Sequence, residues 1–471
     1  MKNKRSIIII SIVVLIALLA GILSYLYLKT DIFKTNQQLF YKYLLSNEMM
    51  KDNGLNKAST LFERKKKYNN TENGNIQISY GTNNAANVAD LQELFKINYQ
   101  LNSNVQTKQS NGQLDLISNN QSIFKGSFIK DVNVYGIFLD KITNRYLSVE
   151  NSNLKEFLKK LGAADVSDFP DSIPEIDIIE LLKIDDETLN SLKTTYTTII
   201  EQNINKEHFS KSKSQDGSTV LLMTLTDSEI LNIEQKLLET AKNDDILINL
   251  LVNKLNSVNY KLSSDTVKNK IQEIINKTAN KETKNTEALK IELTVQNKTA
   301  KKYKITTITD NDSNLLEISF ENNKMIMHLV TTNSNSSLQD DITYVITKED
   351  NGSNLVYTIS AKSQKNNLNY SFNVEINNYL SNNVGINLTQ NINSDNSVAN
   401  IKYNSNIMFS DNVKIENLTN DNSVKLNNMT QEQINGIVTA LVQRFNQVYG
   451  NQIETAIAGF KMSGLKQITE E

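Results

Sequence analysis

From Glu287 to about residue 416, apolar and polar residues alternate almost without interruption. Apolar residues occupy every second position in runs such as Ile291, Leu293 and Val295; Met325, Met327 and Leu329; and Phe372, Val374 and Ile376. Because successive side chains of a strand point to opposite faces, this period of two predicts an antiparallel meander with one apolar face. Turn residues such as Asn351-Gly352 separate the runs.

The apolar face of such a meander has to pack against another layer. A helix that could cover it is predicted directly after the meander, where Thr430 and Gln433 have the spacing of a capping box. Apolar residues then recur at helical spacing at Ile434, Ile437, Val438, Leu441, Val442, Phe445 and Val448. We expect this helix to lie on the C-terminal sheet.

A second set of strands is predicted near the start of the chain, between about residues 74 and 148. Within it, Asn111-Gly112 is a strong signal for a hairpin turn. A helix should follow and end at Gly162.

The middle of the chain, residues 165–286, is predicted to form a connector and helices with one short hairpin. Pro170 and Pro174 fall in the connector. A helical stripe follows at Leu189, Leu192, Tyr196, Ile199 and Ile200. Asp216-Gly217 indicates a turn between two strands, and Thr226 with Glu229 predicts a capping box that opens the next helix.

Residues 6–28 form an uncharged apolar stretch of 23 residues without proline. As a helix it would be about 34 Å long, enough for a hydrocarbon core of about 30 Å. Lys2, Lys4 and Arg5 precede it, so the positive-inside rule places the N-terminus in the cytoplasm and the bulk of the chain outside the cell. A cleaved signal peptide is the alternative, but its apolar core is usually shorter.

These signals predict an α+β protein, with an N-terminal transmembrane helix followed by two curved antiparallel β-sheet domains packed with helices. The predicted segments are a cytoplasmic tail (1–5), the transmembrane helix (6–28), a juxtamembrane helical segment (31–70), a first sheet domain (71–164), a connector and helical region with a short hairpin (165–286), a meander with its covering helix (287–460) and a tail (461–471).

Composition excludes several kinds of function. The 471 residues carry 50 basic and 52 acidic side chains, a net charge of −2, which argues against a nucleic-acid partner. The chain has no cysteine, so disulfides and a lipid-modified cysteine are excluded. It has two histidines, His208 and His328, in separate predicted domains, so we expect neither a histidine metal site nor a cofactor.

Two weak patterns in the sequence resemble catalytic or metal-binding motifs. Asp310, Asp312, Asn314 and Glu321 have the spacing of ligands in a calcium loop, but Leu315 stands where that loop needs glycine. A serine and a lysine at Ser210 and Lys213, with a Ser-Asp-Asn triplet from Ser410, resemble motifs of penicillin-recognising enzymes, but the third motif is missing. We therefore predict no catalytic, cofactor or metal residues.

Three stretches resemble a known group of proteins: KTDIFKTNQQLFYKYL, VYGIFLDKITNRYLSVENSNLKEFLKKLG and NNMTQEQINGIVTALVQRF. They resemble an uncharacterised family, a domain of unknown function, of single-pass membrane-anchored surface proteins from clostridia and related low-GC Gram-positive bacteria. The family implies no activity. A curved meander with a helix across it is also similar to lipoprotein-localisation carriers, a likeness at the level of the fold alone.

The functional prediction is a membrane-anchored extracytoplasmic binding or structural protein, with a protein, a cell-wall component or a lipid as partner. One alternative is a carrier or sensor of a lipid or other apolar ligand, lined by Met325, Met327, Phe372 and Phe445. Those four residues could equally form a dry core. A second alternative is a cell-envelope hydrolase.

Overall fold

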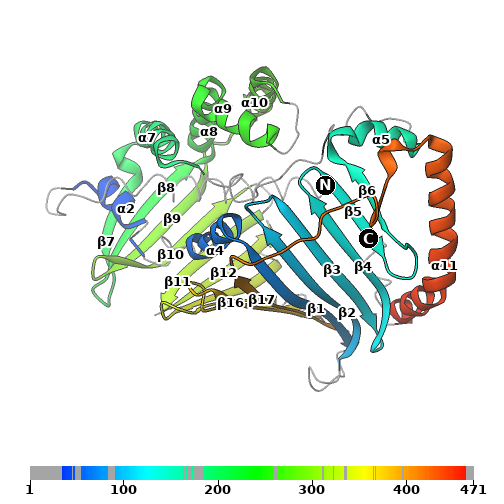
Figure 1. The fold of residues 1–471 in the computed structure, drawn as a ribbon. Coiled ribbons are helices and arrows are strands. Elements are labelled where there is room, and N and C mark those ends of the chain that lie inside the picture. Colours follow the sequence, from blue (N-terminus) through cyan, green and yellow to red (C-terminus); the bar gives the residue numbers. More distant parts are fainter. Residues whose placement is uncertain are drawn as a thin grey trace. The chain divides into compact units, whose positions relative to one another are not determined.

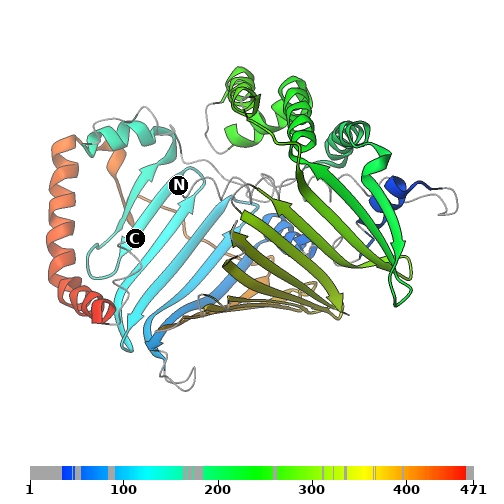
Figure 2. The same cartoon turned by 180° about the vertical axis from the view of Figure 1, so that it is seen from behind.

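The computed structural model describes residues 34–44, 46–47, 55–82, 91–162, 166, 172, 184–257, 262–279, 281–309, 312–321, 323–333, 337–363, 365, 368–394 and 397–462 (Figures 1 and 2). The chain divides into two compact units. Unit 1 comprises Met1–Lys57, Ile176–Val345 and Ser363–Lys365, and unit 2 comprises Ala58–Glu175, Ile346–Lys362 and Asn366–Glu471. The predicted membrane segment 6–28 and the connector prolines lie outside the described residues.

Unit 1 is built on a run of antiparallel strands. These are β7 (Phe209–Lys213), β8 (Thr219–Thr226), β9 (Glu287–Gln296), β10 (Thr299–Ile308), β11 (Asp312–Glu321) and β12 (Lys324–Asn333), each paired with the next. Strand β13 (Leu338–Asp350) begins in unit 1 and ends in unit 2. The alternation in the sequence therefore forms antiparallel strands, as predicted.

The described helices of unit 1 are α2 (Asn36–Leu44), α7 (Asp186–Asn203), α8 (Asp227–Asn243), α9 (Asp245–Asn256) and α10 (Ser264–Ala279), with the short η5 (Lys206–His208). The turn at Gly217 and the helix of the predicted stripe, α7, are confirmed. The capping box of Thr226 and Glu229 opens α8 as expected.

The core of unit 1 lies between these helices and the strands. Leu221, Leu293 and Ala300 are almost fully buried within it. Helix α2 packs into the same core, where the rings of Phe40 and Tyr41 meet Phe209 edge to face at 5.4 and 5.5 Å. Helix α2, which lies in the predicted juxtamembrane segment, thus docks on unit 1 by burying Leu39, Phe40, Tyr41, Tyr43 and Leu44.

Two polar residues after α2 fasten it to strand β10. The Ser46 hydroxyl accepts a hydrogen bond from the backbone N–H of Ala300 at 2.7 Å, and the Asn47 amide donates to the carbonyl of Ala300 at 3.1 Å. Tyr303 on β10 donates to the carbonyl of Leu44 at 2.5 Å. These bonds satisfy backbone groups in a buried place, where an unpaired group would be costly.

Unit 2 is formed by a longer succession of strands. In order of pairing they are β15 (Leu368–Asn377), β16 (Asn383–Asn393), β17 (Ser397–Phe409), β1 (Asn70–Thr82), β2 (Gln92–Asn104), β3 (Gln109–Ser118), β4 (Gln121–Asp131), β5 (Val134–Leu139), β6 (Tyr146–Glu150) and β18 (Ser423–Lys425). Only the pairing of β6 with β18 is parallel among these described ladders. Strand β14 (Leu355–Ser363) lies almost wholly in unit 2 as well.

In the described part of unit 2, four helical segments accompany these strands: α4 (Leu55–Lys67), η4 (Asn151–Asn153) with α5 (Leu154–Lys160), η6 (Leu426–Asn428) and α11 (Gln431–Met462). Gly162, just after α5, has a positive φ of 87°, which confirms it as the helix stop. Helix α4 places Leu61 over Val384 and Ile407 in a small buried cluster.

Helix α11 begins at the predicted capping box, since Thr430 and Gln433 bond each other's backbone N–H groups. It does not cover the meander. Its Phe445 and Tyr449 rings pack on Phe124 of β4, at 6.4 and 5.7 Å between centroids. Val438 and Val442 of the predicted stripe are 40% and 54% exposed.

The predicted fold class is wrong. The described strands number eighteen, and the strands of the two predicted sheet domains are not two separate sheets. Within unit 2 the reason is β1, which pairs with β2 on one side and with β17 on the other, so the N-terminal strands continue into the C-terminal meander. Among the described residues, no helix combines the length and apolar character needed to cross a membrane.

Candidate functional site

Strands β1 to β5 of unit 2 present two chemically different faces. Residues opposite one another in an antiparallel ladder point to the same face. One register row reads Asn73, Gln100, Gln113, Ser127 and Phe138 from β1 to β5. The neighbouring residues on the other face read Glu72, Leu101, Gly112, Phe128 and Ile137. The sheet thus has a polar and an apolar face over the same five strands.

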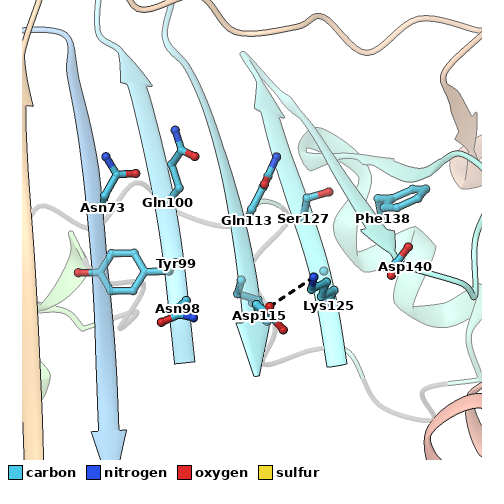
Figure 3. Close-up of a pocket in the computed structure, with 12 residues that line it drawn as sticks. Asn73, Asn98, Tyr99, Gln100, Gln113, Asp115, Lys125, Ser127, Phe138 and Asp140 are labelled. Atoms are coloured by element: carbon cyan, nitrogen blue, oxygen red, sulfur yellow. Dashed lines mark ion pairs between the residues drawn. The ribbon is translucent and has the colours of Figure 1, made fainter. Parts of the chain in front are cut away.

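The polar face holds a shallow depression of about 510 Å³. Figure 3 shows the first polar row side by side across the strands, with Asn98, Asp115, Lys125 and Asp140 next to it. Asn73, Gln100 and Gln113 are exposed, and Asn98 is half-buried. We call this surface the polar depression.

The amides of the polar depression differ from those around it. Outside the depression, several amides on these strands are hydrogen-bonded: Asn102 donates to the amide of Asn111 at 2.8 Å, and Gln77 donates to the carboxylate of Glu93 at 2.7 Å. Within the depression, the side chains of Asn73, Asn98, Gln100 and Gln113 form no hydrogen bond with any described residue. Their donors and acceptors are available to a ligand.

The charges of the polar depression nearly cancel. Lys125 forms an ion pair with Asp115 at 3.4 Å, drawn as the dashed line in Figure 3, and the Ser122 hydroxyl also donates to Asp115 at 2.5 Å. Asp140 adds a second carboxylate. The Ser127 hydroxyl lies 3.2 Å from the hydroxyl of Tyr146 and has no histidine beside it among the lining residues, so the depression lacks an activated nucleophile.

The apolar face of the same strands is open to solvent in places. Leu101, Leu114, Phe128 and Ile137 are 36%, 40%, 37% and 54% exposed. The glycines between them are covered by neighbouring side chains, because a Cβ at Gly112 would overlap the ring of Phe128 and a methyl group of Leu101. Neighbouring side chains thus occupy the space over Gly112 and shelter part of this face.

A buried carboxylate, Glu72 on β1, lies at one side of this apolar face. Its Oε1 accepts hydrogen bonds at 2.8 Å from the hydroxyls of Tyr99, Tyr403 and Ser405. Its Oε2 pairs with the ammonium of Lys65 on α4 at 2.5 Å. We call these five residues the Glu72 cluster.

The negative charge of Glu72 is compensated by Lys65 and by the three hydroxyl groups of the cluster. Burial alone would raise the pKa of Glu72, but the hydrogen bond and charge of Lys65, with the hydroxyls of Ser405 and Tyr403, outweigh burial and lower that pKa to about 2. Burial and the neighbouring carboxylate raise the pKa of Tyr99. A carboxylate this well satisfied is a structural tie between β1, β2, β17 and α4, not a proton donor at neutral pH.

The residues of the calcium-like pattern do not surround one point. Asp312 and Glu321 are the first and last residues of β11, and a strand of that length separates them by about 30 Å. Asn314 instead accepts a hydrogen bond from Thr331 on β12 at 2.8 Å. Asp310 lies outside the described residues. Among the described residues, no cluster of three or more potential metal ligands was found.

The four residues suggested for an apolar ligand are divided between the units. Met325 and Met327 pack against the core of unit 1. Phe372 belongs to β15 in unit 2, and Phe445 of α11 contacts Phe124. The described contacts thus give core packing to Met325 and Met327 and a ring contact to Phe445.

The two histidines lie apart in the sequence and bond to acidic partners. His208 pairs with Glu229 at 3.1 Å, and His328 pairs with Asp341 at 2.8 Å. Neither pair belongs to the polar depression.

The polar depression and the Glu72 cluster were not singled out from the sequence. A signal for the cluster was present, because the alternation in GNIQISY puts Glu72 on the same face as Ile76 and Ile78. A charged residue at an apolar position indicates a buried partner. The polar depression had no comparable signal, since asparagine and glutamine are abundant throughout the chain.

Comparison with solved structures gives only remote similarity. Two mutants of the porin from Rh. blastica align with 72% of this chain and 99% of their own, at 6% sequence identity and TM-scores of 0.17 and 0.18. Likeness at that level carries no argument about fold or function. No curated protein matches the chain.

One family model does match, and it spans residues 1–456. Its description is a family of unknown function, DUF6583. This match confirms the expected membership of an uncharacterised family. The protein therefore belongs to the DUF6583 family.

Proposed function

We propose that the protein is a membrane-anchored extracytoplasmic binding protein that holds a polar component of the cell envelope in the polar depression of unit 2. The observation that carries the proposal is a group of four neighbouring amides in the depression, those of Asn73, Asn98, Gln100 and Gln113, whose side chains have no partner among the described residues. Exposed polar groups fixed on a rigid sheet are prearranged for a ligand.

Anchoring is inferred from the sequence. Residues 6–28 carry no charge, and Lys2, Lys4 and Arg5 precede them, which favours insertion with the N-terminus in the cytoplasm. The depression would then face outward, where envelope polymers and surface proteins are found.

Binding is favoured over catalysis by the chemistry of the lining. Asp115 is neutralised by Lys125 and bonded by Ser122, so it is a poor general base. Tyr99 directs its hydroxyl to Glu72 rather than to a ligand.

Filling the depression should abolish binding. We expect the full chain, in detergent micelles, to sediment with purified Gram-positive cell walls, and Gln113→Trp to remove that sedimentation. Tryptophan is well tolerated on an exposed strand position and would occupy the centre of the depression. Gln443→Trp on the exposed side of α11 is the matched control and should sediment like the natural chain. Equal sedimentation of both variants would contradict the proposed site.

The apolar face supports a second candidate function, that of a carrier or sensor for a lipid or other apolar ligand. Leu101, Leu114, Phe128 and Ile137 are exposed together on neighbouring strands, and patches of this kind mark interaction sites.

For this second candidate, native mass spectrometry of the full chain released from detergent micelles should show an adduct of lipid mass. Phe128→Glu should eliminate the adduct, because it places a charge within the patch. Val442→Glu, on a more exposed apolar residue of α11, should retain it. An adduct that persists in Phe128→Glu would rule out this face as the lipid site.

A further inference from the structure

We propose that the ligand of the polar depression is a neutral glycan chain that lies across strands β1 to β5. This inference rests on the proposed function and specifies its ligand. The hydrogen-bonding groups, the charge and the extent of the depression all match a chain of uncharged, hydroxylated rings.

The hydrogen-bonding groups are amides. Asn73, Asn98, Gln100 and Gln113 each offer one acceptor and two donors, and none of these side chains is used by another described residue. A sugar hydroxyl is also both a donor and an acceptor, so paired bonds from one amide to neighbouring hydroxyls are geometrically natural. An anionic polymer would instead be matched by arginine and lysine, of which the lining contains one, Lys125.

The charge of the lining disfavours ionic ligands. The lining holds two carboxylates and one ammonium, and the ammonium is already paired with Asp115. A polyanion would gain little from a cation that is already neutralised, and Asp140 would repel it. A polycation would meet one unpaired carboxylate at most. A neutral ligand would not be repelled by the charges of this surface.

The extent of the depression suits a chain rather than one small molecule. It crosses five strands, and four spacings of about 4.8 Å amount to about 19 Å. Phe138 lies at one end of the first polar row, with the Tyr146 ring 5.6 Å away. An aromatic face there can pack against the apolar face of a sugar ring.

A peptide fits the same surface less well. Peptides commonly bind to sheets by adding a strand at an edge or by placing side chains in apolar pockets. The depression lies on the face of strands that are paired on both sides, and its lining is mainly polar.

The test is titration calorimetry of the full chain in micelles of a detergent without a sugar headgroup. The probes are the linear hexamers of N-acetylglucosamine and of glucose, with the hexamer of galacturonic acid as an anionic comparison. We expect at least one neutral hexamer to bind and its disaccharide to bind about tenfold more weakly, because it reaches fewer of the amides. The affinity should be unchanged between about 50 mM and about 500 mM salt, since no ion pair is formed.

The paired variants locate the site. Gln100→Ala combined with Gln113→Ala should weaken binding of the neutral hexamer by about tenfold or more, through the loss of two sets of hydrogen bonds. Gln443→Ala combined with Gln447→Ala, which removes two exposed amides of α11, should leave it unchanged. Binding that is insensitive to the first pair, or stronger for the anionic hexamer, would overturn the inference.

Failure of this inference can be told apart from failure of the proposed function. If no hexamer binds but cell walls are still sedimented and Gln113→Trp prevents it, the depression binds an envelope component that is not a neutral glycan, and only the glycan inference falls. If the chain binds neither the hexamers nor the cell walls, both the proposed function and the glycan inference are wrong.

Discussion

Replacing Glu72 with alanine should destabilise unit 2 by about 3 kcal/mol, one of the two largest effects we expect from any single substitution in this chain. Three hydroxyl groups, of Tyr99, Tyr403 and Ser405, would lose their shared acceptor, and Lys65 would lose its partner. The Lys65 side chain is 30% exposed and can regain water, so the loss should fall at the lower end of the range for a broken buried pair.

The same interaction predicts how stability depends on pH. The pKa of Glu72 in the folded chain is about 2, below its ordinary value of 4.5, because Lys65 and the hydroxyls favour the carboxylate more than burial disfavours it. The stabilisation is therefore complete above the unfolded pKa and is lost as pH falls toward the folded pKa. A shift of this size corresponds to about 3 kcal/mol, lost between about pH 5 and about pH 2.

Hydrogen exchange of β1 and β17, with urea unfolding followed by circular dichroism, measures both effects. Glu72→Gln should be less stable than the natural chain at pH 7, and its stability should fall less between those two pH values. Glu349→Ala, at an exposed glutamate of β13, is the control and should change stability by no more than about 0.5 kcal/mol. A natural chain whose β1 protection does not weaken in acid would contradict the role given to Glu72.

Local structure followed closely from the sequence, because it depends on periodicity and capping. The strands of the alternating region, α7, the two capping boxes and the stop at Gly162 were all predicted. Each is decided within a few residues by side chains that bond or shield their own backbone.

The partners of each strand could not be predicted from the sequence, because pairing between distant strands leaves no periodic signal. Nothing in β1 indicates that β17, more than 300 residues later, is its neighbour. The alternation of β1 would be the same beside any strand with an apolar face. The prediction of two separate sheets was wrong because of this ladder. The predicted role of α11 was wrong for a similar reason, since an apolar stripe on a helix does not indicate which surface the helix packs against.

The pair Asn111-Gly112 shows how a local signal can have a different cause. It predicted a turn, yet both residues lie inside β3, and the turn before that strand comes at Lys108, whose φ is positive. Glycine is needed at 112 because Leu101 and Phe128 fill the space that a Cβ would take. A glycine that accommodates a neighbouring strand cannot be distinguished in the sequence from one that permits a turn.

The polar depression could not be predicted for a related reason. Its amides become a site only because two register pairs bring Asn73, Gln100 and Gln113 into one row, where their side chains have no partner among the described residues. In the sequence these residues are indistinguishable from Asn102 and Asn111, which the same ladders pair with each other.

Gly74→Ala should be as damaging as the loss of Glu72, although it adds only a methyl group. A Cβ at Gly74 would lie 2.5 Å from the carbonyl oxygen of Asn404 and 2.5 Å from the hydroxyl of Tyr99. The carbonyl belongs to the β1–β17 ladder and cannot withdraw, so the new group would displace Tyr99 from Glu72 and spread the ladder. Overpacking of about 1–3 kcal/mol, with a lost hydrogen bond of about 1 kcal/mol, gives a destabilisation of about 2–4 kcal/mol.

Gly385→Ala on β16 is the matched control for this effect. A Cβ at Gly385 would meet the Cβ of Asn377 at 3.6 Å, an ordinary contact. Since glycine inside a strand is less favourable than alanine by about 0.5–1 kcal/mol, this change should be neutral or stabilising. The same urea unfolding measurement compares the two variants. Similar stabilities for both would contradict the crowding at Gly74. If crowding acts through Tyr99, the double variant Gly74→Ala with Tyr99→Leu should be more stable than the sum of its single effects, because both changes disrupt one contact.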